Sequence, residues 1–151
     1  MNIYQRLTED HGKQRGMAAG LAKTEGDSAE RNRLFEEFCN ELEAHAAAEE
    51  QTFYAELIAT NDGQEKARHS VAEHKQAADL IKKLQQTDMS SSAWLQTFKK
   101  LKEEVEHHVD EEENEVFPLA QQLISEQRAN ELADEFAARK EAELSERSEA
   151  A

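Results

Sequence analysis

Residues that interrupt helices are rare in this sequence and gather at a few places. The 151 residues include only five glycines and one proline, Pro118. Turn-forming residues cluster at 26–28, 60–63 and 87–92, and Ser125 can cap a last helix. The segments between these clusters are rich in Ala, Leu, Glu, Lys and Gln, which favour helices. The chain is therefore predicted to be all-helical, with Pro118 ending or kinking one helix.

The spacing of the breakers predicts four long helices and a shorter fifth. Their expected ranges are 3–24, 29–59, 64–87, 92–117 and 125–146. Long helices joined by short connections pack as an antiparallel up-down bundle. We expect an all-α, four-helix-bundle domain over residues 1–147, with a short additional C-terminal helix packed over the bundle through its apolar residues, and a frayed tail at 148–151.

Charge and composition exclude several classes of binding partner and indicate where the protein resides. The formal net charge of −15 argues against nucleic acid or an anionic membrane as a partner, because both would repel the chain. No apolar run approaches the ~20 residues needed to span a bilayer, and the first eleven residues lack the pattern of a signal peptide. The single cysteine, Cys39, favours a reducing compartment. The sequence predicts a soluble, cytoplasmic protein.

Several polar residues fall inside apolar helical stripes when successive residues are rotated by about 100°. His45 and Glu49 lie in the stripe of the second helix, while Glu112 lies at the centre and His108 at the edge of the stripe of the fourth. The apolar positions of these two stripes are Leu34, Phe38, Leu42, Phe53, Trp94, Phe98, Leu101, Val105, Val109 and Val116.

Two further histidines share faces with apolar residues, and two do not. His11 and His74 point inward on the first and third helices, whereas His69 and His107 are rotated out of their stripes. The residues that share a face with His11 or His74 are Ile3, Leu7, Ala18, Leu21, Ala67, Val71, Ala78 and Ile81. A buried carboxylate is costly unless it is paired or bound to metal, although ordinary surface pairs four residues apart are the alternative.

An internal repeat favours a common site over surface pairs. Positions 11, 45, 49 and 54 recur at 74, 108, 112 and 117, a constant offset of 63 residues. Two helical hairpins would thus each supply one His plus a HxxxE motif, and their packing would bring both sets together inside the bundle. Duplication alone would not keep polar residues inside, so we favour a metal site over a metal-free interaction bundle.

The donor set restricts the metal. Imidazoles and carboxylates suit Fe, Mn, Zn or Cu. Cys39 is expected towards the edge of its stripe, so no thiolate is offered. Two glutamates can bridge two ions and four histidines give two to each, which suits iron or manganese better than a closed zinc site. Asp10, Glu50, Glu73 and Glu113 neighbour the histidines and can accept their second N–H.

The pattern H…HxxxE…H…HxxxE, closed by HHVDEEENEVFP, resembles the hemerythrin-like family, also called the HHE cation-binding domain. The resemblance covers about residues 3 to 125. It implies two iron ions in an oxo- or hydroxo-bridged centre, with Glu49 and Glu112 as bridges. The ligands carried over by position are His11, His45, Glu49, His74, His108 and Glu112.

The sequence departs from the oxygen-carrying members of that family. Those carriers have an additional histidine one turn from the position of His74, where this chain has Ser70 and Ala78, and they close with HxxxxD rather than HxxxE. Members that repair iron centres carry an additional N-terminal segment, whereas this chain starts directly on the first helix. With five ligands for each iron, both ions are expected to keep one position open.

Four functions remain open at this point. The first is binding or sensing of dioxygen, nitric oxide or a related oxidant at the di-iron centre. The second is removal of peroxide by a catalase- or peroxidase-like reaction, and the third is iron storage or delivery. The fourth is a metal-free bundle that binds another protein. Tyr4 and Tyr54 are expected mainly in the core, with a role beside the iron centre as the alternative.

Overall fold

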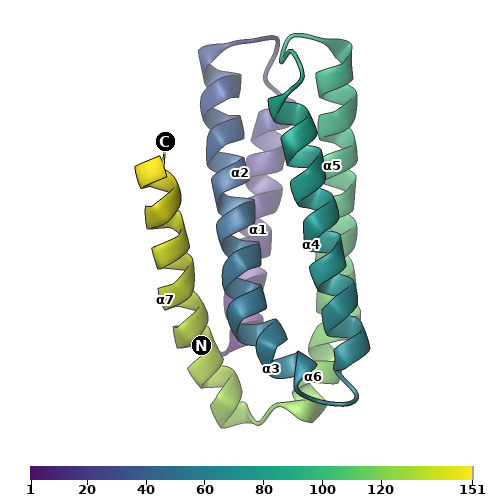
Figure 1. Cartoon of the computed structure of the whole chain (residues 1–151), viewed down its shortest axis with the longest axis vertical. Helices are drawn as coiled ribbons and strands as arrows, with labels where there is room; N and C mark the ends of the chain where they lie inside the picture. Colours follow the sequence, from purple (N-terminus) through teal and green to yellow (C-terminus); the bar gives the residue numbers. More distant parts are fainter. Residues whose placement is uncertain (151) are drawn as a thin grey trace.

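The computed structural model describes the backbone of residues 1–150 and the side chains of residues 1–148. Four long helices form the bundle: α1 (Ile3–Ala22), α2 (Ala29–Glu49), α4 (Gln64–Gln85) and α5 (Ser92–Glu111). Short connections join them, so consecutive helices run in opposite directions (Figure 1). No strand occurs among residues 1–150. The predicted all-α, four-helix architecture is confirmed.

Local sequence signals set the helix starts. Asn2 caps α1, where its side chain accepts from the Gln5 N–H and the Gln5 side chain accepts from the Asn2 N–H. Ser28 and Ser91 cap α2 and α5 in the same manner, each accepting one backbone N–H of the first turn. Gly26 adopts a φ of 61° in the turn before α2, a conformation that favours glycine.

Two π-helical turns interrupt the second and fourth long helices. They are η1 (Glu50–Tyr54), followed by α3 (Ala55–Ile58), and η2 (Glu112–Val116), followed by α6 (Phe117–Leu123). The fourth helix was expected to end near Pro118, but it continues to residue 123. Proline is tolerated there because it lies in the first turn of α6, where the missing N–H costs least.

The C-terminal helix α7 (Glu126–Ala150) is not short. It has 25 residues and passes the expected end near residue 146. It lies along the outside of α2 (Figure 1) and packs against α1 and α2, where Leu132 and Phe136 are fully buried. Packing over the bundle is thus confirmed. Of the tail predicted at 148–151, residue 151 and the side chains of 149 and 150 lie outside the described residues.

The apolar core is divided into two clusters, one at each end of the bundle. The predicted ligands lie between these clusters along the helices, which places them in the dry middle of the molecule. The first cluster includes Ile3, Leu7, Phe53, Leu57, Phe117, Leu132 and Phe136. The second includes Leu21, Phe35, Phe38, Cys39, Ile81, Trp94, Phe98 and Leu101.

Two positions differ from the expected stripes. Cys39 was expected towards the edge of its stripe, but it is buried in the second cluster. Ala78, expected on the inner face of α4, is exposed. The buried members of the second cluster come from α1, α2, α4 and α5, so Cys39 is covered by the four long helices themselves.

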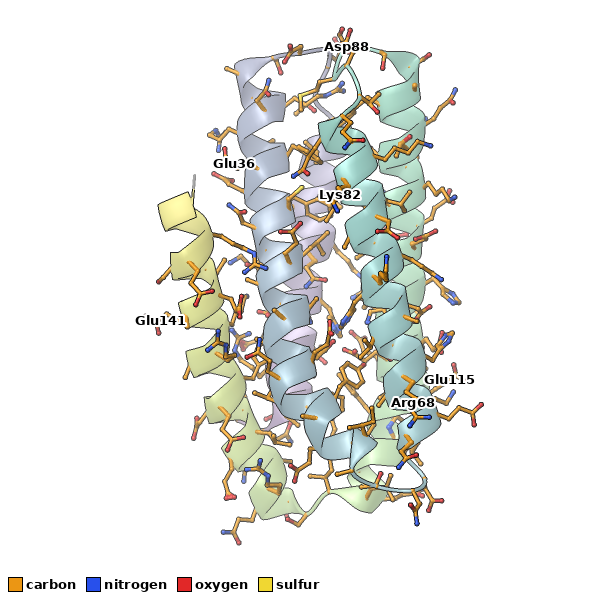
Figure 2. All side chains as sticks on the ribbon, viewed as in Figure 1. Glu36, Arg68, Lys82, Asp88, Glu115 and Glu141 are labelled. Carbon is orange, nitrogen blue, oxygen red and sulfur yellow. The ribbon has the colours of Figure 1, made fainter. Side chains whose placement is uncertain are left out.

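The outer faces of the helices carry the charges. The labelled Glu36, Glu115 and Glu141 point away from the bundle (Figure 2). Among the described residues, no helix is long and apolar enough to cross a bilayer.

Candidate metal centre

All six predicted ligands converge between the two apolar clusters. Glu49 and Glu112 are fully buried, and His11 and His45 are nearly so. His74 and His108 are partly buried. A carboxylate in such a dry position is stable only with partners of opposite charge or with a metal ion.

The ligand atoms form two groups that share a glutamate. The first group has four buried residues and the second has three residues. In each group, every residue contributes one possible ligand atom, and these atoms all lie within 4.8 Å of one another. The members of the first group are His11, His45, Glu49 and Glu112, and those of the second are Glu49, His74 and His108. Residues from all four long helices thus meet at two adjacent positions.

Glu49 and Glu112 each direct one carboxylate oxygen to the histidines of the first hairpin and the other oxygen to those of the second. In both residues Oε1 and Oε2 approach histidines of different hairpins, which is the arrangement a bridging carboxylate requires. The oxygen–nitrogen distances are 3.3 Å for Glu49 Oε2–His45 Nε2, 3.1 Å for Glu49 Oε1–His74 Nε2, 3.0 Å for Glu112 Oε1–His11 Nε2 and 3.4 Å for Glu112 Oε2–His108 Nε2.

A carboxylate stands behind every one of the four histidines and accepts from its Nδ1. The pairs are His11 with Glu113 at 2.6 Å, His45 with Asp10 at 2.7 Å, His74 with Glu50 at 2.9 Å and His108 with Glu73 at 2.9 Å. These contacts direct all four Nε2 atoms to the centre, and carboxylate–histidine pairs of this kind typically orient metal ligands. The sequence left open whether these four acidic residues accept from the histidines or lie on a solvated acidic face, and the structure shows that they accept.

Several buried atoms at the centre have no hydrogen-bond partner among the described residues. They are His11 Nε2, Glu112 Oε1 and both carboxylate oxygens of Glu49. Buried polar atoms rarely remain unpaired in folded proteins. Because these are nitrogen and carboxylate donors that face a common point, they fit first-row transition metal ions such as iron.

The charges at the centre shift the proton affinities of its residues. Burial alone would lower the pKa of His45, but the charge of Glu49 and the hydrogen bond with Asp10 raise it to about 9. Burial opposes the charged form of Glu112, but His108 and His11 hold the pKa of its carboxyl well below its usual range. Without metal, a proton on His45 therefore helps to balance the glutamates, and a bound cation has to displace it.

Two tyrosines lie near the centre in different roles. Tyr54 donates its hydroxyl hydrogen to Glu112 Oε2. Burial and the nearby glutamates raise the pKa of Tyr54 well above its usual value, so it remains a phenol. Tyr4 packs its ring against Phe53 and Phe117, and burial raises its pKa to about 12. Tyr54 thus contacts a predicted ligand directly, whereas Tyr4 belongs to the core.

Sequence reasoning missed a buried lysine on α7. Lys140 Nζ lies 2.9 Å from Asp10 Oδ2 and also donates to Glu41, while Arg6 reaches the other oxygen of Asp10 at 2.5 Å. Asp10 in turn accepts from His45, so α7 contributes to holding that histidine. The signal was present in the sequence, because Lys140 lies four residues after Phe136 on the apolar stripe of α7.

The two outward histidines behave as predicted. The side chains of His69 and His107 are 52% and 71% exposed, and neither contributes to the two groups at the centre. Helical phase therefore separated the adjacent His107 and His108 correctly.

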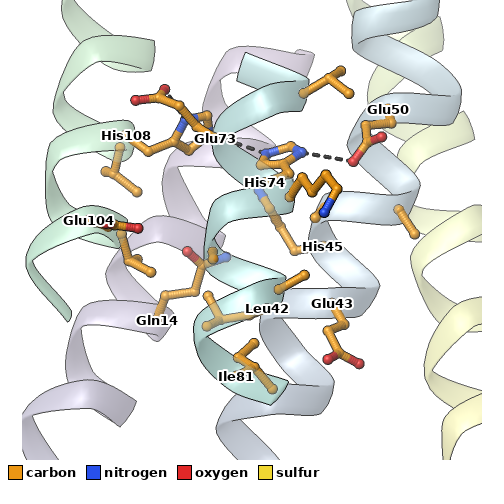
Figure 3. Close-up of a pocket in the computed structure, with 18 of the residues that line it drawn as sticks. Gln14, Leu42, Glu43, His45, Glu50, Glu73, His74, Ile81, Glu104 and His108 are labelled. Carbon is orange, nitrogen blue, oxygen red and sulfur yellow. Dashed lines mark hydrogen bonds and ion pairs between the residues drawn. The ribbon is translucent and has the colours of Figure 1, made fainter. Parts of the chain in front are cut away.

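A pocket of about 650 Å³ connects the centre with the surface. It is lined by residues of all four long helices and by Arg147 of α7. It reaches the four central histidines, of which Figure 3 labels His45, His74 and His108. Figure 3 shows His74 pointing toward Glu50, with Glu73 beside His108. Ala78 lines this pocket.

The fold and the site together define a class: a four-helix bundle with a cluster of histidines and glutamates, able to hold metal ions, in its middle. A family model described as the hemerythrin HHE cation-binding domain matches residues 2–120. The chain therefore belongs to the hemerythrin-like HHE family, as the sequence resemblance predicted.

Individual relatives agree with this assignment. The uncharacterised protein Rv2633c of Mycobacterium tuberculosis is 28% identical over 140 residues, which is 92% of this chain and 85% of that protein. An uncharacterised hemerythrin-like protein of Schizosaccharomyces pombe is 26% identical over 136 residues, 89% of this chain and 66% of that protein. The crystal structure of an HHE domain-containing protein from Mycobacterium kansasii, a homolog of Rv2633c, matches with a TM-score of 0.86 at 28% identity, over 97% of this chain and 89% of that chain.

Proposed function

We propose that this chain is a non-haem di-iron protein that binds or senses dioxygen, nitric oxide or a related oxidant. The observation that carries the proposal is the position of Glu49 and Glu112, each of which directs one oxygen to each of two adjacent histidine pairs. That arrangement suits two metal ions held side by side, and the mixed imidazole and carboxylate donors suit iron.

The chain's own residues would hold and shield the centre. His11 and His45 would bind one ion, His74 and His108 the other, and the two glutamates both. Bound iron would supply redox chemistry towards small oxygen- or nitrogen-containing molecules. The apolar clusters on either side exclude water, and Tyr54 keeps a hydrogen bond on Glu112.

Metal analysis of the purified protein tests this proposal. We expect about two iron ions per chain after expression in iron-rich medium, with an absorption spectrum that changes when azide or nitric oxide is added. A matched Glu49→Gln, Glu112→Gln variant removes both carboxylate charges at similar size and is expected to lose the iron. Protein without bound metal, or iron retained by this variant, would contradict the proposal.

Peroxide removal is the second candidate, and the pocket that reaches His74 and His108 favours it. A small substrate can enter by this route without displacing a helix. Turnover of hydrogen peroxide by the iron-loaded protein, absent from the glutamine variant, would support the enzyme. Iron spectra that respond to nitric oxide without peroxide turnover would favour the binding or sensing function.

We also propose a cytoplasmic location. The single thiol, Cys39, is buried, and burial raises its pKa well above the usual range. It is therefore protected from oxidation in the resting protein. Fractionation of the native cells with an antibody against the chain would test this location.

A further inference from the structure

The two histidines outside the centre form a second cluster on the outer surface of α4 and α5. His69 and Glu73 lie four residues apart on α4, and His107 and Glu111 lie four residues apart on α5. The surface therefore carries two further HxxxE motifs, directly opposite one another. We call these four residues the outer cluster.

Three side chains of the outer cluster form one group, and His107 lies beside both of its carboxylates. Atoms of His69, Glu73 and Glu111 lie within 4.8 Å of one another. The nitrogen–oxygen distances are 3.2 Å for His69–Glu111, 3.6 Å for His69–Glu73, 3.3 Å for His107–Glu111 and 3.7 Å for His107–Glu73, and each involves the histidine Nε2. Two isolated pairs on separate helices would not place both imidazoles against both carboxylates.

The internal repeat shows what the outer cluster lacks. Glu73 corresponds to Asp10 at the 63-residue offset, and His69 corresponds to Arg6. Behind Asp10, two permanent cations compensate the carboxylate, because Arg6 and Lys140 both bond to it. Behind Glu73 the same place is lined by two imidazoles and one further carboxylate, Glu111. Asp10 thus has the cations Arg6 and Lys140 as partners, whereas the corresponding Glu73 has imidazoles in their place.

We propose that the outer cluster binds one divalent first-row metal ion, such as Zn²⁺ or Fe²⁺, in addition to the metal centre inside the bundle. His69, Glu73 and Glu111 supply three ligand atoms of the kinds that zinc accepts, and His107, which contacts both carboxylates, can supply a fourth. The ion takes the role that Arg6 and Lys140 play for Asp10. Because the histidines are exposed, it exchanges readily with solvent.

The outer cluster is linked to the inner centre through Glu73. Oε1 of Glu73 lies 2.9 Å from His108 Nδ1, while Oε2 faces His69 and His107. An ion in the outer cluster therefore shares a carboxylate with a residue of the inner centre. Only this link rests on the proposed function; metal binding by the outer cluster does not.

Zinc binding by the metal-free full-length chain, with any affinity tag removed, tests the proposal. The number of Zn²⁺ ions per chain is measured by equilibrium dialysis and elemental analysis for the natural chain and for a His69→Asn, His107→Asn variant. The control is a Lys75→Asn, Asp79→Asn variant, which alters an exposed i,i+4 pair on the same helix. We expect the histidine variant to bind one Zn²⁺ fewer per chain and the control to bind the natural number.

The outcomes separate the outer cluster from the inner centre. If the natural chain binds one Zn²⁺ and the histidine variant none, the outer cluster is confirmed and the inner centre fails. If the natural chain and the histidine variant bind equal numbers, the outer cluster is overturned, whatever the inner centre does. As a second readout, the natural chain is titrated with Zn²⁺ until its binding sites are saturated. The NMR signals of the His69 and His107 rings should shift during this titration and should remain in place in a Glu111→Gln variant. Signals that stay unchanged in both proteins at saturation would overturn the proposal.

Discussion

Replacement of Lys140 by methionine tests how strongly α7 is fastened to the metal centre. Lys140 is buried, and its ammonium group contacts the buried carboxylates of Asp10 and Glu41. Methionine retains much of the aliphatic stem and removes only the charge. Two buried carboxylates would thereby lose a cation that water cannot replace.

The expected cost follows from these contacts. Breaking a buried ion pair typically costs about 3–5 kcal/mol. Asp10 keeps its contacts with Arg6 and His45, so we expect a loss near the lower limit, about 3 kcal/mol. For a chain of this size that corresponds to a decrease in melting temperature of about 6–12 °C.

Thermal and urea unfolding followed by circular dichroism would measure this loss. The matched control is Lys75→Met, which breaks an exposed i,i+4 pair with Asp79. Such pairs contribute about 0.3–0.5 kcal/mol, so the control should melt within about 2 °C of the natural protein. Equal effects of Lys140→Met and Lys75→Met would refute the reasoning.

A double-mutant cycle distinguishes lost charge from lost packing. Glu41→Gln removes the carboxylate that Lys140→Met leaves with only the exposed Lys13, at 3.5 Å, as a cationic partner. The glutamine substitution should therefore be less costly in the methionine background than in the natural chain, by about 1–3 kcal/mol. Additive effects of the two substitutions would show that the interaction contributes nothing beyond side-chain packing.

Three further predictions concern the metal centre. His108→Ala should strip or cripple the iron centre, whereas His107→Ala should leave the absorption spectrum of the inner iron nearly unchanged; iron content measures both. Removing iron should lower the melting temperature, and the difference between iron-loaded and metal-free protein should grow with pH between about 6.5 and 9. The pKa of His45 is raised from 6.5 to about 9, so its proton stabilises the metal-free fold at low pH. This contribution is lost as the pH rises through 9. A constant difference in melting scans across that range would contradict this account. Tyr54→Phe removes the hydrogen bond to Glu112 and should cost about 1.5–3 kcal/mol, with iron retained and its absorption bands displaced; an unchanged spectrum and stability would argue against a role for the tyrosine.

Helical phase predicted the inner side chains well because most of the bundle is regular α-helix. His11, His45, Glu49 and His74 converge as expected, and His107 points outward. Counting residues along one helix needs no knowledge of its neighbours. The 63-residue repeat then indicated which helices would meet. That these residues bind iron remains a prediction.

Features that depend on tertiary contacts were not predicted. The π-turns η1 and η2 follow or begin at the two central glutamates, and residue spacing alone does not show where an i→i+5 pattern replaces i→i+4. The length of α7 was underestimated because its exposed face is strongly polar. Lys140 lies on the apolar stripe of α7, but its partners Asp10 and Glu41 are on α1 and α2, and residue spacing does not show that α7 covers these helices.

The added helix makes two otherwise similar halves unequal. Each hairpin supplies the same kinds of candidate ligands, but α7 packs mainly on the first. There Phe136 lies 5.3 Å from His45 between ring centroids, and Lys140 forms an ion pair with Asp10. The pocket is lined by all four histidines, but those of the second hairpin are the more exposed. The side chains of His11 and His45 are 1% and 7% exposed, and those of His74 and His108 are 10% and 14% exposed. We therefore expect small molecules to approach from the side of the second hairpin. Ligand counting alone predicts that a small molecule can reach both ions equally. The number of ligands fixes the open positions on each ion, but the surrounding helices, α7 among them, decide which of these positions a molecule can reach.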